Sequence, residues 1–118
     1  MTLSILLVED EVMIRMMVAD MVETLGHQIA AEAGNIDQAM ELAQSASFDF
    51  AIIDMNLNGI MSFPIADAIA SREIPFIFAS GYGSTRDFGQ QRQALVLQKP
   101  FTIENLETAI KQAQHVES

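Results

Sequence analysis

Five short apolar runs recur along the chain, separated by longer segments of different periodicity. The runs are rich in Ile, Val, Leu and Phe and too short for helices, which is typical of strands buried on both faces of a parallel sheet. The predicted strands are residues 4–8, 28–33, 48–53, 75–79 and 94–98. The alternation predicts one α/β domain with helices on both faces of the sheet.

Between these runs, apolar residues return at helical spacing, and several turn residues mark where helices begin or end. Asn35, with Gln38 three residues later, is typical of a capping box, and Pro64 fits the first turn of a helix. The predicted helical segments are 11–25, 35–46, 64–71, 81–93 and a last helix capped by Thr102. Three glycines weaken segment 81–93, so we expect the fourth helix to be short or mobile.

The first helix carries more apolar residues than one buried face needs. At helical spacing, one arc should face the sheet; it contains Ile14, Met17, Val18, Met21, Val22 and Leu25. Three further apolar residues fall outside that arc: Val12, Met13 and Met16. Exposed methionines suit a docking surface, although scattered exposed apolar residues are also normal.

The length of 118 residues predicts a single domain, residues 1–118, with no output domain. A net charge of −10 argues against nucleic acid or an anionic membrane as a partner. The chain has no cysteine, so the cytoplasm is the default location. Its uncharged stretches are far shorter than the ~20 residues that span a bilayer.

Polar residues stand where the apolar runs end. Glu9 and Asp10 follow the first run, Asp54 the third, Ser80 the fourth and Lys99 the fifth. Ligands of doubly wound sheets bind beyond the carboxyl ends of the strands, so we expect these five side chains at one edge.

This set of residues is suited to phosphoryl chemistry. Asp10 and Asp54 offer the oxygen ligands that Mg²⁺ prefers, and Glu9 adds charge nearby. Lys99 and the metal would offset the negative charge, Ser80 could donate to a phosphoryl oxygen, and Asp54 could attack phosphorus. Taken singly, each of these residues is more often a helix cap, a turn former or a surface lysine. The interpretation therefore depends on all five residues lying at the ends of strands.

The sequence resembles the receiver domain of bacterial two-component response regulators over essentially its whole length. Four segments carry the resemblance: residues 6–11 (LLVEDE), 51–57 (AIIDMNL), 78–81 (FASG) and 97–101 (LQKPF). The resemblance implies strand order 2-1-3-4-5 with five flanking helices, and a cis Lys99–Pro100 bond.

The same resemblance implies the role of each site residue. Asp54 would be the phosphoacceptor, Ser80 the switch hydroxyl and Lys99 the lysine that pairs with phosphate. Mg²⁺ would be held by Glu9, Asp10, Asp54 and the backbone carbonyl of Asn56.

Three positions depart from the usual receiver pattern. Val96 replaces an aromatic switch residue, Asn58 replaces a proline, and Ser80 stands where threonine is commoner. The pattern resembles a subgroup of stand-alone receivers with a Phe-Ala-Thr-Gly-like motif. We hypothesise that phosphorylation orders segment 81–93 through Ser80.

The sequence therefore predicts a phosphoacceptor in a phosphorelay, not a turnover enzyme. Its donor would be a histidine kinase or phosphotransfer protein, and it would act on an unknown protein target or as a phosphate shuttle or sink. The main alternative is a phosphate-independent interaction module on the same fold. A phosphohydrolase with an aspartate nucleophile is less favoured, because Asn56 stands where its second acid would be.

Overall fold

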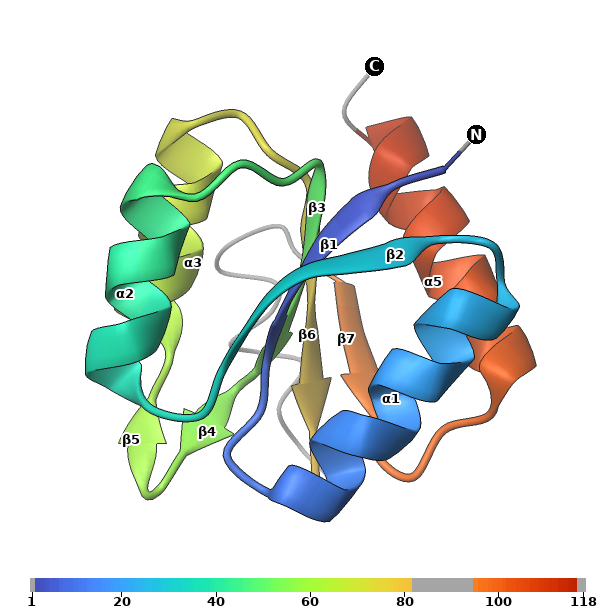
Figure 1. The fold of residues 1–118 in the computed structure, drawn as a ribbon, viewed down its shortest axis with the longest axis horizontal. Coiled ribbons are helices and arrows are strands. Elements are labelled where there is room, and N and C mark those ends of the chain that lie inside the picture. The colour runs from blue at the N-terminus through green and yellow to red at the C-terminus, as the bar shows by residue number, and fades with distance from the viewer. Residues whose placement is uncertain (1, 82–94, 117–118) are drawn as a thin grey trace.

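Strand β3 (Phe50–Asp54) forms the centre of the structure, and all five of its residues are buried. Such a segment needs apolar layers on both sides, and the helices supply them (Figure 1). This computed structural model describes residues 2–81 and 95–116. The described part is three layers deep, with one parallel sheet between two pairs of helices.

The main sheet has five strands in the order β2-β1-β3-β6-β7, and every neighbouring pair is parallel. Counted among themselves these strands run 2-1-3-4-5, as expected; the labels differ because two short strands intervene. Besides β3, the sheet comprises β1 (Ser4–Val8), β2 (Gln28–Ala33), β6 (Phe76–Ser80) and β7 (Leu95–Gln98).

Two of these strands end one residue later than predicted, so that Asp54 and Ser80 are their last residues. Both side chains are therefore placed by the sheet ladder itself, and Asp54 pairs with Ala79 across β3 and β6. Functional groups on the last residue of a strand are held more firmly than groups on a loop.

Within residues 2–81 and 95–116, two helices pack on each face of the sheet (Figure 1). One face packs against α1 (Val12–Thr24) and α5 (Ile103–Val116), and the other against α2 (Ile36–Ser45) and α3 (Phe63–Ser71). The cap by Asn35 is confirmed, since its side chain accepts a hydrogen bond from the Gln38 amide at 2.8 Å. The Gln38 side chain accepts from the amide of Gly34 at 3.1 Å, one residue before the position that a capping box uses. The prediction of a short or mobile helix over 81–93 falls on residues 82–94 and lies outside the described residues.

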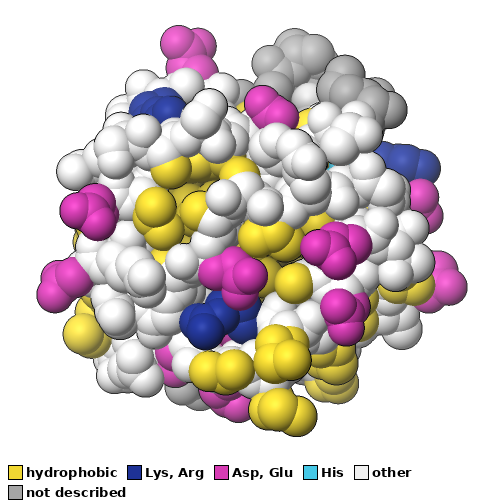
Figure 2. Space-filling model, viewed as in Figure 1, with side chains coloured by type: hydrophobic (Ala, Val, Ile, Leu, Met, Phe, Trp, Pro, Cys, Tyr) yellow, Lys and Arg dark blue, Asp and Glu magenta, His cyan; other side chains and the backbone are white. Residues whose placement is uncertain are grey.

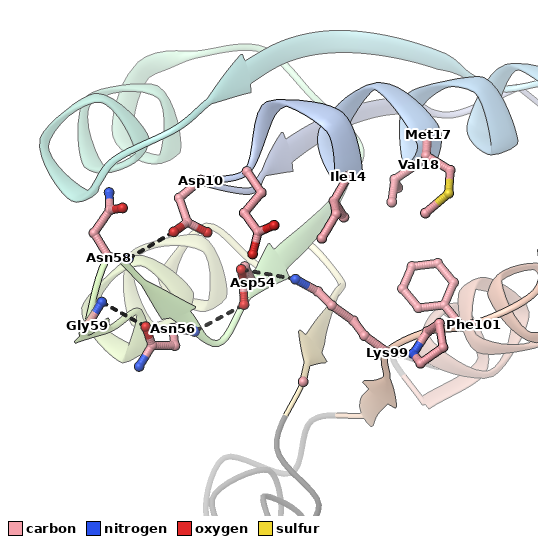
Figure 3. A pocket seen from close by; sticks show the side chains of 13 residues that line it. Asp10, Ile14, Met17, Val18, Asp54, Asn56, Asn58, Gly59, Lys99 and Phe101 are labelled. Carbon is pink, nitrogen blue, oxygen red and sulfur yellow. Dashed lines mark hydrogen bonds and ion pairs between the residues drawn. The ribbon is translucent and has the colours of Figure 1, made fainter.

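Most of the predicted arc of α1 packs against the sheet, but Met17 does not. Val18 and Val22 are buried, whereas Met17 is 49% exposed. The reason is that Met17 lines an open pocket, facing Phe101 across it (Figure 3). Helical spacing predicts a direction and not how far the sheet extends.

A short hairpin between β3 and α3 was missed by the sequence analysis. Strands β4 (Asn56–Leu57) and β5 (Ile60–Met61) are antiparallel and joined by Asn58 and Gly59. The φ angles of these two residues are 53° and 87°. Positive φ at both positions is what a tight two-residue hairpin turn needs, and Asn-Gly is its strongest sequence signal.

The hairpin turn gives a test of Asn58, which stands where receivers usually have proline. We expect Asn58→Pro to lower the free energy of unfolding by more than about 1 kcal/mol, because proline cannot adopt a positive φ. Urea unfolding measures the change. Asn58→Gly, which keeps both the amide N–H and the positive φ, is the matched control and should stay close to the wild type; equal stability of the two variants would contradict this account.

Candidate functional site

Three carboxylates, those of Glu9, Asp10 and Asp54, meet beyond the carboxyl ends of β1 and β3. Figure 3 shows two of them, Asp10 and Asp54. Glu9 and Asp54 are buried, and Asp10 is half-buried. One oxygen from each residue lies within 4.8 Å of the others. Three like charges at this spacing repel one another strongly unless a cation lies among them.

Lys99 provides that cation. Its Nζ lies 2.6 Å from Oε1 of Glu9 and 3.1 Å from Oδ2 of Asp54. Its backbone amide donates to the carbonyl of Ser80 at 2.7 Å, which ties the end of β7 to the end of β6. The cis Lys99–Pro100 bond that the resemblance implied is confirmed.

The protonation of Lys99 is secured by the same contacts. Desolvation lowers its pKa, but the hydrogen bond to Glu9 and the attraction of Asp54 and Glu9 outweigh that effect. The net pKa of Lys99 is raised, so the ammonium keeps its charge at neutral pH.

The pKa values of Asp54 and Asp10 shift in opposite directions. Desolvation and the charge of Glu9 raise the pKa of Asp54 to about 7, against the opposing effects of Lys99 and the Asn56 amide. For Asp10, desolvation raises the pKa but hydrogen bonds outweigh it, first among them the one from the Asn58 amide, and the pKa is lowered. Asp10 is therefore the permanently charged acid of the pair, and Asp54 responds to its surroundings.

The β4–β5 hairpin contributes directly to this geometry. The amide of Asn58 donates to Oδ2 of Asp10 at 3.2 Å, and the amide of Asn56 donates to Oδ1 of Asp54 at 3.2 Å. The Asn56 side chain in turn accepts from the Gly59 amide at 2.8 Å. The hairpin thus holds both aspartates, which the apolar pattern of residues 56–61 does not suggest.

Ser62 is a further residue that the sequence analysis missed. It is fully buried, and its hydroxyl donates to the backbone carbonyl of Asp54 at 2.6 Å. Its amide donates to the Met55 carbonyl at 2.9 Å. A serine just before a helix is typical of an N-cap, yet the Ser62 side chain makes no capping hydrogen bond to α3. Its hydrogen bond goes to Asp54, the last residue of β3, instead.

The last of the predicted site residues, Ser80, ends β6 and is buried. Since Ala79 pairs with Asp54, Ser80 lies one residue beyond Asp54 on the neighbouring strand. The sheet therefore brings Ser80 to the edge that holds the acids and Lys99, as expected from the strand order.

A pocket of about 520 Å³ opens over these groups (Figure 3). One end is polar and contains Asp10, Asp54 and Lys99. The other end is apolar and runs between α1 and the start of α5; it is lined by Ile14, Met17, Val18, Pro100 and Phe101. The pocket is larger than a phosphoryl group needs, so it can admit part of a larger partner.

The donor set fits Mg²⁺, which prefers carboxylate oxygens and keeps part of its water shell. Glu9, Asp10 and Asp54 each offer an oxygen within one small cluster, and Asp10 is partly open to solvent. Phosphoryl groups bring further negative charge. A lysine beside the carboxylates, together with a Mg²⁺ ion, would compensate that charge, so the site is suited to phosphoryl groups. The fold and the site therefore define an α/β signalling or transfer domain that handles phosphoryl groups.

The comparisons with known proteins give the family. The family described as response regulator receiver domain matches residues 5–111, and the chain belongs to it. Receiver domains are signalling modules of two-component systems, so phosphorylation-based signalling is the general function of the chain. They bind Mg²⁺ at an acidic pocket, which here corresponds to the cluster of Glu9, Asp10 and Asp54.

Several relatives were found by sequence. The transcriptional regulatory protein PdtaR of Mycobacterium tuberculosis is 34% identical over 92% of this chain and 55% of its own length. The phyllosphere-induced regulator PhyR of Methylorubrum extorquens is 29% identical over 96% of this chain and 44% of its own length. The chain thus spans about half the length of these two relatives.

Solved structures agree with the fold. The solution structure of SdrG from Sphingomonas melonis superposes with a TM-score of 0.79 at 37% identity, covering 94% of this chain and 95% of that one. The receiver domain of PhyR from Erythrobacter litoralis gives a TM-score of 0.82 at 29% identity, covering 97% and 91%. The predicted family and fold class are confirmed.

The pKa of Asp54 leads to a prediction in Mg²⁺-free buffer. Because that pKa is about 7 when folded and near 3.8 when unfolded, the folded protein binds more protons between these values. The stabilisation is complete below the unfolded pKa and is lost as the pH rises through the folded one. We expect the unfolding free energy of Asp54→Asn minus that of the wild type to grow from about pH 4 to about pH 8.

Urea unfolding at a series of pH values measures this difference, and groups that do not interact with Asp54 cancel. A difference that does not change with pH would mean that Asp54 is not perturbed.

Proposed function

We propose that the protein is a phosphoacceptor in two-component signalling and that Asp54 receives the phosphoryl group. The observation that carries the proposal is Lys99, whose ammonium bridges Glu9 and Asp54 inside the acidic cluster. Such a lysine compensates the acids before the reaction and can pair with phosphoryl oxygens afterwards.

The proposed reaction is a transfer from a phosphohistidine. A carboxylate oxygen of Asp54 attacks phosphorus, the bond from phosphorus to the imidazole nitrogen breaks, and an acyl phosphate forms while the imidazole leaves. Lys99 pairs with the transferred group, and the Ser80 hydroxyl donates to one of its oxygens. When bound by Glu9, Asp10, Asp54 and the backbone carbonyl of Asn56, Mg²⁺ supplies positive charge for the same oxygens.

The donor is proposed to be a histidine kinase or a histidine phosphotransfer protein, and the signal passes on to a protein target or through a phosphate shuttle. Residue 96, where receivers usually carry an aromatic switch, is a half-buried valine on β7. We propose that the hydrogen bond between the Lys99 amide and the Ser80 carbonyl couples the site to its surroundings instead.

The cytoplasmic location and the lack of nucleic-acid or membrane partners stay predictions. Within residues 2–81 and 95–116, no helix is long and apolar enough to cross a bilayer.

Incubation with acetyl phosphate and Mg²⁺, followed by intact mass measurement, tests the phosphoacceptor. We expect one phosphoryl adduct on the wild type and none on Asp54→Asn, because the nucleophilic oxygen pair is lost. Asp37→Asn, on an exposed aspartate in the first turn of α2, is the matched control and should be labelled like the wild type. Absence of an adduct on the wild type would favour the phosphate-independent interaction module.

The donor is proposed to dock on the first turns of α1. Val12, Met13 and Met16 are 56%, 79% and 59% exposed, and apolar side chains gather there at the lower edge of the molecule (Figure 2). This surface lies beside the mouth of the pocket that contains Asp54, which is where a donor histidine must approach.

We expect Met16→Glu to slow phosphotransfer from a phosphorylated histidine phosphotransfer protein while labelling by acetyl phosphate stays unchanged. The reason is that a charge placed in an apolar contact costs binding, whereas a small donor needs no docking surface. Gln44→Glu, an exposed residue of α2, adds the same charge on another helix and should leave both rates unchanged. If both donors slow equally with Met16→Glu, the surface is not the docking site.

A further inference from the structure

The turn that carries Glu9 and Asp10 is only three residues long, between the end of β1 and the start of α1. Its geometry decides where both carboxylates point. Glu9 is the residue with the most partners in this turn. Its amide donates to the Ala33 carbonyl at 3.0 Å, and its Oε2 accepts from the Glu11 amide at 3.1 Å.

The backbone carbonyl of Glu9 has a partner that the site chemistry does not require. The Nη1 atom of Arg15, one turn into α1, donates to this carbonyl at 2.9 Å. Glu9 is only 3% exposed, so without Arg15 the carbonyl would be a buried acceptor with little access to water. The arginine therefore completes the hydrogen bonding of the residue that holds Lys99.

The guanidinium of Arg15 is itself held in place. Its Nε lies 3.2 Å from Oε1 of Glu32 on β2, and its side chain is only 21% exposed. Arg15 thus connects α1, the end of β1 and β2 with one planar group, which a lysine could not do with a single ammonium.

Gly34 provides independent support for this arrangement. A Cβ at residue 34 would lie 2.7 Å from Nη1 of Arg15 and in ordinary contact, 3.8 Å, with the Glu9 carbonyl oxygen. Among the described glycines, positive φ angles occur at Gly26 and Gly59 and not at Gly34. The space taken by the guanidinium is therefore a reason for glycine at this position.

We propose that Arg15 is a positioning residue for the phosphoacceptor site. It holds the backbone carbonyl of Glu9, so that the Glu9 carboxylate stays directed at Lys99 and at the carboxylates of Asp10 and Asp54. Gly34 leaves room for the guanidinium. The effect on phosphotransfer rests on the proposed function, whereas the orientation of Glu9 can be measured without it.

Two variants perturb this arrangement by different routes. Arg15→Met keeps an apolar stem and removes the guanidinium, and Gly34→Ala keeps Arg15 but pushes its guanidinium aside. Arg72→Met is the matched control. Arg72 donates to the carbonyls of Ala43 and Ala46 at 2.7 and 2.8 Å, joining α3 to α2 on the opposite face of the sheet from α1.

Three measurements separate positioning from general stability. We expect Arg15→Met to weaken Mg²⁺ binding, followed by calorimetry, by about 10- to 100-fold, as for other groups that orient metal ligands. Labelling by acetyl phosphate should slow as well. The Glu11 amide, which reports on the Glu9 carboxylate, should exchange its hydrogen faster relative to global unfolding. Gly34→Ala should shift all three readouts in the same direction by less.

Arg72→Met should lower the urea midpoint while leaving Mg²⁺ affinity and Glu11 exchange unchanged. The proposal is overturned if Arg15→Met and Arg72→Met give the same Mg²⁺ affinity and the same Glu11 exchange. If Arg15→Met does not fold, the Gly34→Ala result decides in its place. A wild type that takes no phosphoryl group would end the proposed function, and the exchange of the Glu11 amide would still decide the role of Arg15.

Discussion

The structure depends on one electrostatic constraint: three carboxylates share a space in which, among the described residues, the ammonium of Lys99 is the cation that bridges two of them. Lys99 reaches Glu9 and Asp54 from the end of the edge strand β7, while the acids come from β1 and β3. Bringing these groups together requires all the strands to end at the same edge, which a parallel sheet with right-handed crossovers ensures. The apolar core is thus the scaffold on which an otherwise unfavourable charge cluster is held.

Around that cluster, backbone groups carry much of the work. Amides of Glu11, Asn56 and Asn58 donate to the three acids, and Arg15 and Ser62 hold the carbonyls of Glu9 and Asp54. Because backbone groups have no rotamers, they orient a carboxylate at little entropic cost. The three carboxylates can therefore be held in defined orientations although they lie at the ends of strands, next to loops.

The sequence pattern was sufficient to predict the strands and to place five polar residues at one edge of the sheet, because buried strands and the polar residues after them leave a clear pattern. The strand order came from the resemblance to receiver domains. The sequence did not reveal Arg15 or Ser62, since periodicity predicts which face a residue occupies and not which distant carbonyl its side chain reaches. The hairpin over residues 56–61 had a local signal, Asn58-Gly59, but its strands are only two residues each. Met17 was misplaced because the extent of the sheet beside α1 depends on tertiary packing.

Each acid of the site already has hydrogen-bond partners before any ligand arrives; for Asp10 the partner is the amide at the tip of the hairpin. An incoming ion must therefore replace or share contacts that the protein makes by itself. The hydrogen bonds that orient these acids are thus also competitors of a cation for the same carboxylate oxygens.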